Sequence, residues 1–128
     1  MEGKNILIAE DNPINRKNVV SYLNKIGLQN VHVAGNGEEA VQRCIVSNYH
    51  LILLDFYMPI MDGLQASRMI RQNSKGLNPF IVALTANVSE DSRLRAKESG
   101  MADFMGNPVD PLVLAGKVAT YLLPSNKE

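Results

Sequence analysis

The chain has a single cysteine, no tryptophan and no excess of charge of either sign. Its one cysteine, Cys44, cannot form an internal disulfide, and there is no Cys/His cluster for zinc. Lysine plus arginine equals aspartate plus glutamate, 13 each. That balance argues against a general binder of nucleic acid or acidic membranes, which would carry a basic excess. We expect a cytoplasmic protein in which Cys44 packs within a helix and is not reactive.

Long apolar runs are also missing. No stretch approaches the roughly 18 residues that are needed to span a bilayer. The amino terminus lacks the layout of a signal peptide, because the apolar run 6–9 is short and ends at two acids. We therefore expect no membrane segment, and at 128 residues a single domain that is long enough to bury a core.

Short apolar segments recur along the whole chain, and helical patterns separate them. The predicted strands are residues 6–9, 31–34, 51–55, 80–84 and 103–106. The predicted helices follow Asn12, Gly37, Asp62, Asn87 and Asp110; a loop covers 73–79, and Pro124 ends the last helix. Strands that alternate with helices through short loops predict an α/β protein with a doubly wound, five-stranded parallel sheet. We expect the strand order 2-1-3-4-5, which is inferred from the fold class.

Local patterns predict how one helix begins and which faces of two other helices are buried. Asn87 and Glu90 have the spacing of a capping box at the start of the fourth helix. Apolar spacing predicts a buried stripe on the second helix and another on the last. The stripes are Ala40, Val41, Cys44 and Ile45, and Leu112, Ala115, Val118, Ala119 and Leu122.

Acidic residues stand where two of the predicted strands end. Glu10 and Asp11 follow the first strand, and Asp55 ends the third. In the expected order these two strands are neighbours, so the three carboxylates meet at the switch point of the sheet. Three carboxylates in one crevice repel one another unless a cation intervenes, and Mg²⁺ fits oxygen ligands of this kind best. The backbone carbonyl of Tyr57 is a further candidate ligand; the alternative is that these are ordinary strand-end and capping acids.

Thr85 follows the fourth strand and therefore lies on the same edge of the sheet. Its hydroxyl is suited to hydrogen-bond a phosphoryl oxygen, although a threonine here also serves as a strand or cap residue. Because the three acids lie on the same edge, we favour the role of Thr85 as a phosphoryl-binding residue.

Three segments together resemble a known family. They are residues 6–12 (ILIAEDN), 53–63 (LLDFYMPIMDG) and 83–86 (ALTA). They look like the receiver (response-regulator) domain of two-component signalling, with a match that extends over residues 4–123. The style of residues 10–13 and of the MPIMDG loop most resembles the receivers of hybrid histidine kinases.

The resemblance implies a flavodoxin-like receiver fold and a function. Asp55 would accept a phosphoryl group from a phosphohistidine of a histidine kinase or a histidine phosphotransfer protein, and Glu10 and Asp11 would hold Mg²⁺. Thr85 would move to contact the phosphoryl group, and Phe104 would be the aromatic residue whose rotamer reports the switch. Such a domain is a signalling phosphoacceptor, not an enzyme with an external substrate, and no DNA-binding module accompanies it here.

The sequence departs from the family at one site position. Receivers place a lysine directly before the proline that follows the fifth strand, and here Asn107 precedes Pro108. Asparagine can donate a hydrogen bond but brings no charge, and loss of one such donor costs about 10²–10³ in rate in other enzymes. We expect Mg²⁺ binding to survive and phosphorylation and switching to be impaired.

The sequence is also compatible with alternative functions. The chain is alternatively a pseudo-receiver that binds partners constitutively, or a lysine-to-asparagine variant of an ordinary receiver. An aspartate-nucleophile phosphatase is disfavoured because Tyr57 occupies the position of its second aspartate. A flavodoxin is disfavoured because the acids after the first strand would repel a flavin phosphate.

Overall fold

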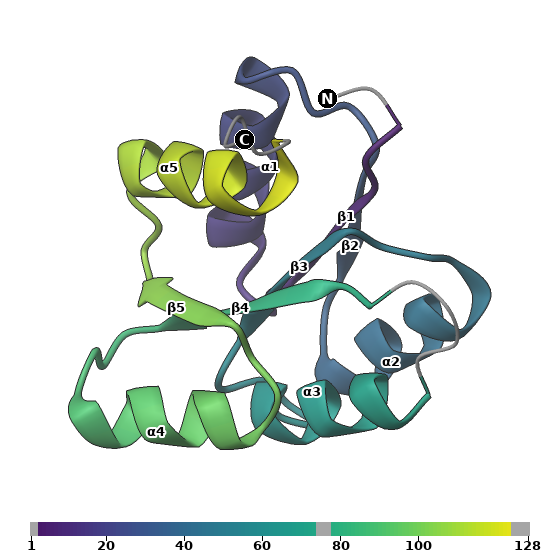
Figure 1. Cartoon of the computed structure of the whole chain (residues 1–128), viewed down its shortest axis with the longest axis vertical. Helices are drawn as coiled ribbons and strands as arrows, with labels where there is room; N and C mark the ends of the chain where they lie inside the picture. Colours follow the sequence, from purple (N-terminus) through teal and green to yellow (C-terminus); the bar gives the residue numbers. More distant parts are fainter. Residues whose placement is uncertain (1–2, 74–77, 124–128) are drawn as a thin grey trace, which may run out of the picture.

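One sheet of five parallel strands organises the molecule, in the order β2-β1-β3-β4-β5 (Figure 1). The computed structural model describes residues 3–73 and 78–123. The strands are β1 (Ile6–Ala9), β2 (Val31–Ala34), β3 (Leu51–Asp55), β4 (Phe80–Thr85) and β5 (Asp103–Gly106). The helices are α1 (Pro13–Lys25), α2 (Gly37–Val46), α3 (Gly63–Gln72), α4 (Glu90–Glu98) and α5 (Pro111–Leu122). The predicted doubly wound sheet and its strand order are confirmed.

Helices cover both faces of the sheet, α1 and α5 on one side and α2, α3 and α4 on the other (Figure 1). Successive strand residues point to opposite faces, so each strand feeds two separate cores. In β1, Ile6 and Ile8 pack in the core beneath α1 and α5, whereas Leu7 and Ala9 pack in the opposite core. The apolar runs of the central strands are therefore buried on both faces, as predicted.

Strand β3 is the middle strand of the sheet and all five of its residues are buried. Leu51 and Leu53 belong to one core and Ile52 and Leu54 to the other. Asp55 is the last residue of the strand, at its carboxyl end. The sheet thus carries a carboxylate to the edge at which open α/β sheets bind ligands.

The predicted start of α4 is wrong. The helix begins at Glu90, and its N-cap is Ser89, whose side chain accepts a hydrogen bond of 3.1 Å from the backbone N–H of Ser92. The backbone N–H of Asn87 donates instead to the Thr85 hydroxyl. That bond commits Asn87 to the turn after β4, so the Asn87–Glu90 capping box does not form.

Three residues that were predicted to be buried are exposed, namely Leu112 and Ala119 on α5 and Ile45 on α2. On α5, Leu112 is 83% exposed, and the buried stripe is Leu114, Val118 and Leu122. Leu112 lies two residues from Leu114, about 200° around the helix, and so faces away from the core. On α2, Ile45 is 64% exposed, because the buried face runs through Gly37, Ala40 and Val41 and Ile45 lies at its margin in the last turn.

The remaining predictions divide between confirmed features and residues that are not described. Gly27, just past the end of α1, has a φ of +96°, and Gly100, just past α4, has a φ of +88°. Both are left-handed helix ends of the kind that glycine favours. Pro124 and residues 74–77 of the predicted 73–79 loop lie outside the described residues. No described helix combines the length and apolar character that a membrane span would need.

Candidate functional site

The ends of β1 and β3 bring three carboxylates together. The two strands pair in parallel with Ala9 opposite Leu54, so the residues that follow them leave the sheet side by side. Glu10, Asp11 and Asp55 each offer a carboxylate oxygen, and these oxygens lie within 4.8 Å of one another. Glu10 is 1% exposed and Asp55 9% exposed, whereas Asp11 faces solvent. The predicted cluster is therefore a crevice with two buried acids and one exposed acid.

Asp55 sits in an environment that disfavours its ionised form. Burial raises the pKa of Asp55 from 3.8 to about 7, and the neighbouring Glu10 and Asp11 add to the rise. The backbone N–H of Tyr57 donates to Asp55 Oδ1 at 3.4 Å, and this hydrogen bond acts in the opposite direction by lowering the pKa of Asp55. A cation placed among the carboxylates would restore the charged form, because an opposite charge nearby favours ionisation.

The loop after β3 is fixed against the strand end by close backbone contact. The Gly63 N–H donates to the Phe56 carbonyl at 2.9 Å, and a Cβ at Gly63 would overlap the backbone carbonyl of Asp55. Asp62 caps α3 by accepting from the Gln65 N–H at 2.8 Å. Any side chain at position 63 would push this loop away from Asp55.

Thr85 lies at the end of β4, on the same edge, and is buried. Its hydroxyl donates to the Asn87 carbonyl and accepts from the Asn87 N–H, both at 3.0 Å. The hydroxyl is thus engaged with its own loop. It can reach a group on Asp55 only if those two bonds are exchanged.

Asn107 follows β5 and reaches across the edge of the sheet to the acids. Its backbone N–H donates to the Thr85 carbonyl at 2.9 Å, and its Nδ2 donates to Glu10 Oε1 at 2.9 Å. The second oxygen of Glu10, Oε2, accepts from the Asn12 N–H at 3.1 Å. Asn107 Oδ1 is buried and has no hydrogen-bond partner among the described residues. Sequence reasoning missed the contact with Glu10, because the two residues are 97 positions apart and only the fold brings them together.

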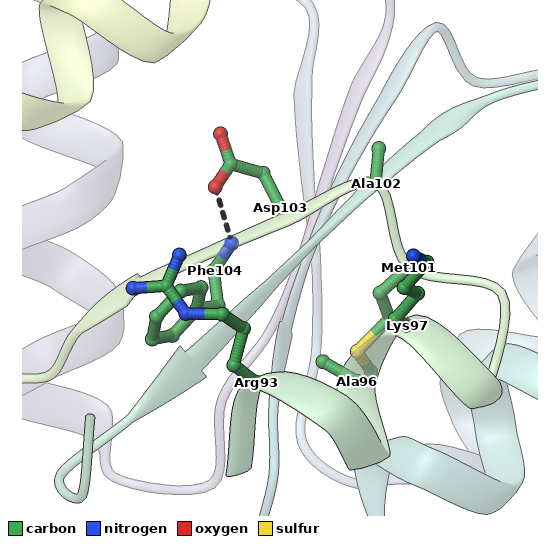
Figure 2. Close-up of a pocket in the computed structure, with 7 residues that line it drawn as sticks. All are labelled: Arg93, Ala96, Lys97, Met101, Ala102, Asp103 and Phe104. Atoms are coloured by element: carbon green, nitrogen blue, oxygen red, sulfur yellow. Dashed lines mark hydrogen bonds between the residues drawn. The ribbon is translucent and has the colours of Figure 1, made fainter. Parts of the chain in front are cut away.

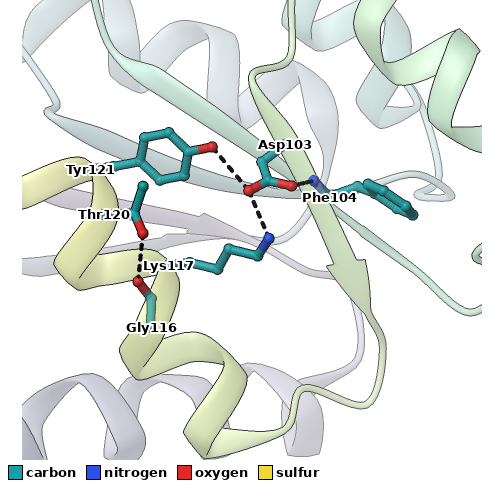
Figure 3. A network of polar contacts seen from close by, with 6 residues as sticks. All are labelled: Asp103, Phe104, Gly116, Lys117, Thr120 and Tyr121. Atoms are coloured by element: carbon teal, nitrogen blue, oxygen red, sulfur yellow. Dashed lines mark hydrogen bonds and ion pairs between the residues drawn. The ribbon is translucent and has the colours of Figure 1, made fainter.

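The ion pairs of the described residues lie away from the three carboxylates. Lys117 Nζ lies 2.7 Å from Asp103 Oδ2, in a network that also includes the Tyr121 hydroxyl at 2.9 Å (Figure 3). The other ion pair of residues 3–73 and 78–123 joins Arg93 to Glu90. Arg16 donates to the backbone carbonyl of Glu10, not to its carboxylate. In this part of the chain no ion pair reaches the three carboxylates.

Phe104 lies on β5 in a groove between that strand and α4 (Figure 2). The groove has a volume of about 360 Å³, and Phe104 is half-buried in it. The Arg93 guanidinium lies over the ring, 4.5 Å from its centroid. The aromatic side chain therefore makes a cation–π contact at the surface, and its residue pairs with Ala83 of β4, two residues before Thr85.

The residues of the crevice fit a hard divalent cation. Oxygen is the donor atom in all three carboxylates, and the unpartnered Asn107 Oδ1 adds a buried acceptor beside them. Mg²⁺ binds through one or two carboxylates, keeps several waters and completes its shell with phosphate oxygens. The crevice therefore suits a magnesium ion together with a phosphoryl group on the nearby carboxylate.

Known proteins resemble this chain over most of its length. Residues 6–119 match the family model of the response regulator receiver domain. Hybrid signal transduction histidine kinase K of Dictyostelium discoideum is 44% identical over 110 residues, which cover 80% of this chain and 9% of that protein. The chain spans less than a tenth of the length of the first curated relatives that it matches.

Solved structures of receiver domains also have a similar fold. The receiver domain of the sensor histidine kinase PA1611 from Pseudomonas aeruginosa has a magnesium ion coordinated in its active site cleft. It superposes with a TM-score of 0.84 at 32% identity and covers 93% of this chain and 97% of that one. A co-crystal of the Saccharomyces cerevisiae phosphotransfer protein Ypd1 with the receiver domain of Ssk1 matches with a TM-score of 0.86 at 34% identity, covering 92% and 88%.

Proposed function

Because this chain belongs to the response regulator receiver domain family of two-component signalling, we propose that it is a phosphoacceptor in a phosphorelay, with Asp55 as the acceptor. One observation carries the proposal. Asp55 ends the middle strand of the sheet, buried beside Glu10 and Asp11 at the edge where such sheets bind ligands. We propose that the receiver domain extends over residues 4–123.

The proposed reaction transfers a phosphoryl group to a carboxylate oxygen of Asp55. The new O–P bond forms as the P–N bond of a phosphohistidine breaks, and the electron pair of that bond stays on the donor's imidazole. In such transfers the protein mainly positions groups and stabilises charge. The Tyr57 N–H, 3.4 Å from Asp55 Oδ1, orients the carboxylate for this attack. The only chemistry we assign to the domain is its own phosphorylation and dephosphorylation.

Mg²⁺ is the proposed cofactor, and Glu10, Asp11 and Asp55 would hold it, with the Tyr57 backbone carbonyl as a further ligand. When bound, the ion neutralises negative charge on the carboxylates and on the transferring phosphoryl group. The magnesium-bound cleft of the PA1611 receiver supports this choice of metal.

Thr85 and Phe104 form the proposed switch. A phosphoryl group brings about −1.5 to −2 of charge, estimated from other phosphorylated side chains. That charge and its oxygens offer the Thr85 hydroxyl a partner to replace Asn87. We propose that the movement of Thr85 frees Phe104 to change rotamer within the groove between α4 and β5.

The proposed donors are a histidine kinase or a histidine phosphotransfer protein. The complex of Ypd1 with the Ssk1 receiver supports a partner of the second kind. We assign no direct contact with nucleic acid, because the chain has equal numbers of acidic and basic residues. The cytoplasmic location stays a prediction from the sequence.

Asn107 favours one alternative, a pseudo-receiver that binds partners without phosphate chemistry. A lysine at this position would supply a cation for the phosphoryl group, whereas Asn107 supplies only a neutral amide that is bound to Glu10. In a lysine-to-asparagine variant of an ordinary receiver, phosphorylation would be slowed but retained. These alternatives differ in whether Asp55 is phosphorylated at all.

Incubation with acetyl phosphate and Mg²⁺, followed by intact-mass measurement, separates them. A receiver gains the mass of one phosphoryl group, and Asp55→Asn abolishes the gain. Asn107→Lys, which restores the family residue, is expected to accelerate the gain. No mass gain in either the wild type or Asn107→Lys would favour the pseudo-receiver.

A further inference from the structure

Asn107 changes the charge of the site as well as its hydrogen bonds. Among the described residues, the carboxylates of Glu10 and Asp55 accept hydrogen bonds from neutral donors only, namely the N–H groups of Asn12 and Tyr57 and the amide of Asn107. The two side-chain ion pairs of the described residues lie away from them. Arg16 reaches only the backbone carbonyl of Glu10, so among the described residues no side-chain cation is paired with these carboxylates, and a bound metal ion would supply that charge.

The Asn107 amide is also placed to organise the acids. Nδ2 holds one oxygen of Glu10 while the Asn12 N–H holds the other, so the buried carboxylate is fixed from two sides. Oδ1 has no partner among the described residues, although it is buried. An unpaired buried acceptor is costly, and a metal-bound water is a donor that would satisfy it.

We propose that Asn107 is a positioning residue of the cation site, which holds Glu10 in place and, being neutral, gives the crevice a higher affinity for Mg²⁺ than a lysine would allow. An ammonium group at this position would compete with the cation for the same carboxylates and repel it. The inference rests on the proposed assignment of Glu10, Asp11 and Asp55 to the metal. It makes residue 107 a determinant of how strongly the domain retains its metal before any phosphoryl group arrives.

Magnesium titration followed by ¹⁵N NMR tests the proposal with the whole chain. Asn107→Lys is expected to weaken Mg²⁺ binding by about tenfold or more, because like charges a few ångströms apart repel even in water. Asn107→Ala, which releases Glu10 without adding charge, is expected to weaken it by about two- to fivefold, the effect of losing one modest hydrogen bond. Asn24→Lys is the matched control, since it adds the same charge on the exposed surface of α1.

The side-chain NH₂ signal of Asn107 gives a readout that a merely structural role would not move. We expect it to shift with Mg²⁺ along the same saturation curve as the Tyr57 backbone amide, while the Asn24 side-chain signal stays fixed. A stationary Asn107 signal, or affinity in Asn107→Lys or Asn107→Ala equal to or above that of the wild type, would overturn the proposal. Thermal unfolding of each variant without metal confirms that the folded protein is being titrated.

Acetyl phosphate labelling of the same samples separates this inference from the proposed function. If the wild type is phosphorylated but Asn107→Lys binds Mg²⁺ as tightly, the inference fails and the function stands. If the wild type binds Mg²⁺ with the expected ranking but is not phosphorylated, the inference stands and the function fails. Absence of any saturable Mg²⁺ effect in the wild type overturns both.

Discussion

Asp55 combines burial with like-charged neighbours, and this residue contributes to the pH dependence of the fold's stability. Its pKa in the folded chain is about 7, against 3.8 for the unperturbed group. Between these values the folded state keeps a proton that the unfolded state has lost. Stability linked to Asp55 therefore falls as pH rises through this window.

We predict that the metal-free wild type loses stability to urea between about pH 4 and pH 7, and that Asp55→Asn, which cannot ionise, loses less. Urea titrations in the presence of a chelator measure the difference between the two proteins. Mg²⁺ should restore part of the loss near pH 7, because it favours the ionised carboxylates. An identical pH dependence in both proteins would refute the assigned environment of Asp55.

Thr85 is the second residue whose role can be tested alone. Thr85→Ala removes the two hydrogen bonds with Asn87 and is expected to cost about 1 kcal/mol of stability. It should also uncouple Phe104 from Asp55, so that phosphorylation no longer shifts the NMR signals of the Phe104 ring. Thr85→Ser keeps the hydroxyl and serves as the control. Phe104 shifts that survive unchanged in Thr85→Ala would rule out the proposed switch.

The side chains of the site differ in how far the sequence predicts them. The meeting of Glu10, Asp11 and Asp55 was predictable, because neighbouring parallel strands end at the same edge. The hydrogen bond between Asn107 and Glu10 was not predictable, because no local sequence pattern links a residue that follows β5 to one that follows β1. A missing family lysine pointed to position 107 but not to its partner.

At the scale of elements, glycines decide how closely the loop after β3 approaches the strand. We predict that Gly63→Ala destabilises the fold by about 1–3 kcal/mol, because the added Cβ meets the Asp55 carbonyl and the rigid backbone must move. It should also displace the Asp55 carboxylate and weaken Mg²⁺ binding. Denaturant unfolding and magnesium titration measure the two effects.

Gly116→Ala is the matched control for this prediction. Gly116 lies on the exposed side of α5, where a Cβ meets nothing within 4 Å. The same substitution should stabilise the fold by about 0.5–1 kcal/mol, since alanine favours the helix interior. Equal effects at the two positions would contradict the close approach at Gly63.

Element boundaries were predicted well where the pattern was strong and failed where tertiary contacts decided. Strand β3 was predicted over its observed length, because an apolar run that ends in an acid leaves little choice. The start of α4 was predicted wrongly. The Thr85 hydroxyl binds Asn87 in the turn before the helix, and Ser89 is the N-cap instead. Leu112 was assigned to a buried face because periodicity alone does not fix which side of α5 meets the sheet.

Across the whole molecule, two cores cover the two faces of one sheet, and every proposed functional group except Phe104 lies at its carboxyl edge. The strand order was inferred from the fold class and is confirmed, so the switch point between β1 and β3 was predictable without coordinates. The groove beside Phe104 was not, because it depends on how the sparse apolar side of α4 packs on β5.

The central claim is that Asp55 accepts a phosphoryl group, and chemical trapping tests it most directly. After incubation with acetyl phosphate and Mg²⁺, borohydride reduces an aspartyl phosphate to homoserine, which peptide mass spectrometry locates in the sequence. We predict homoserine at position 55 and none in Asp55→Asn. Homoserine at another acid, or none in a wild type that binds Mg²⁺, would contradict the account.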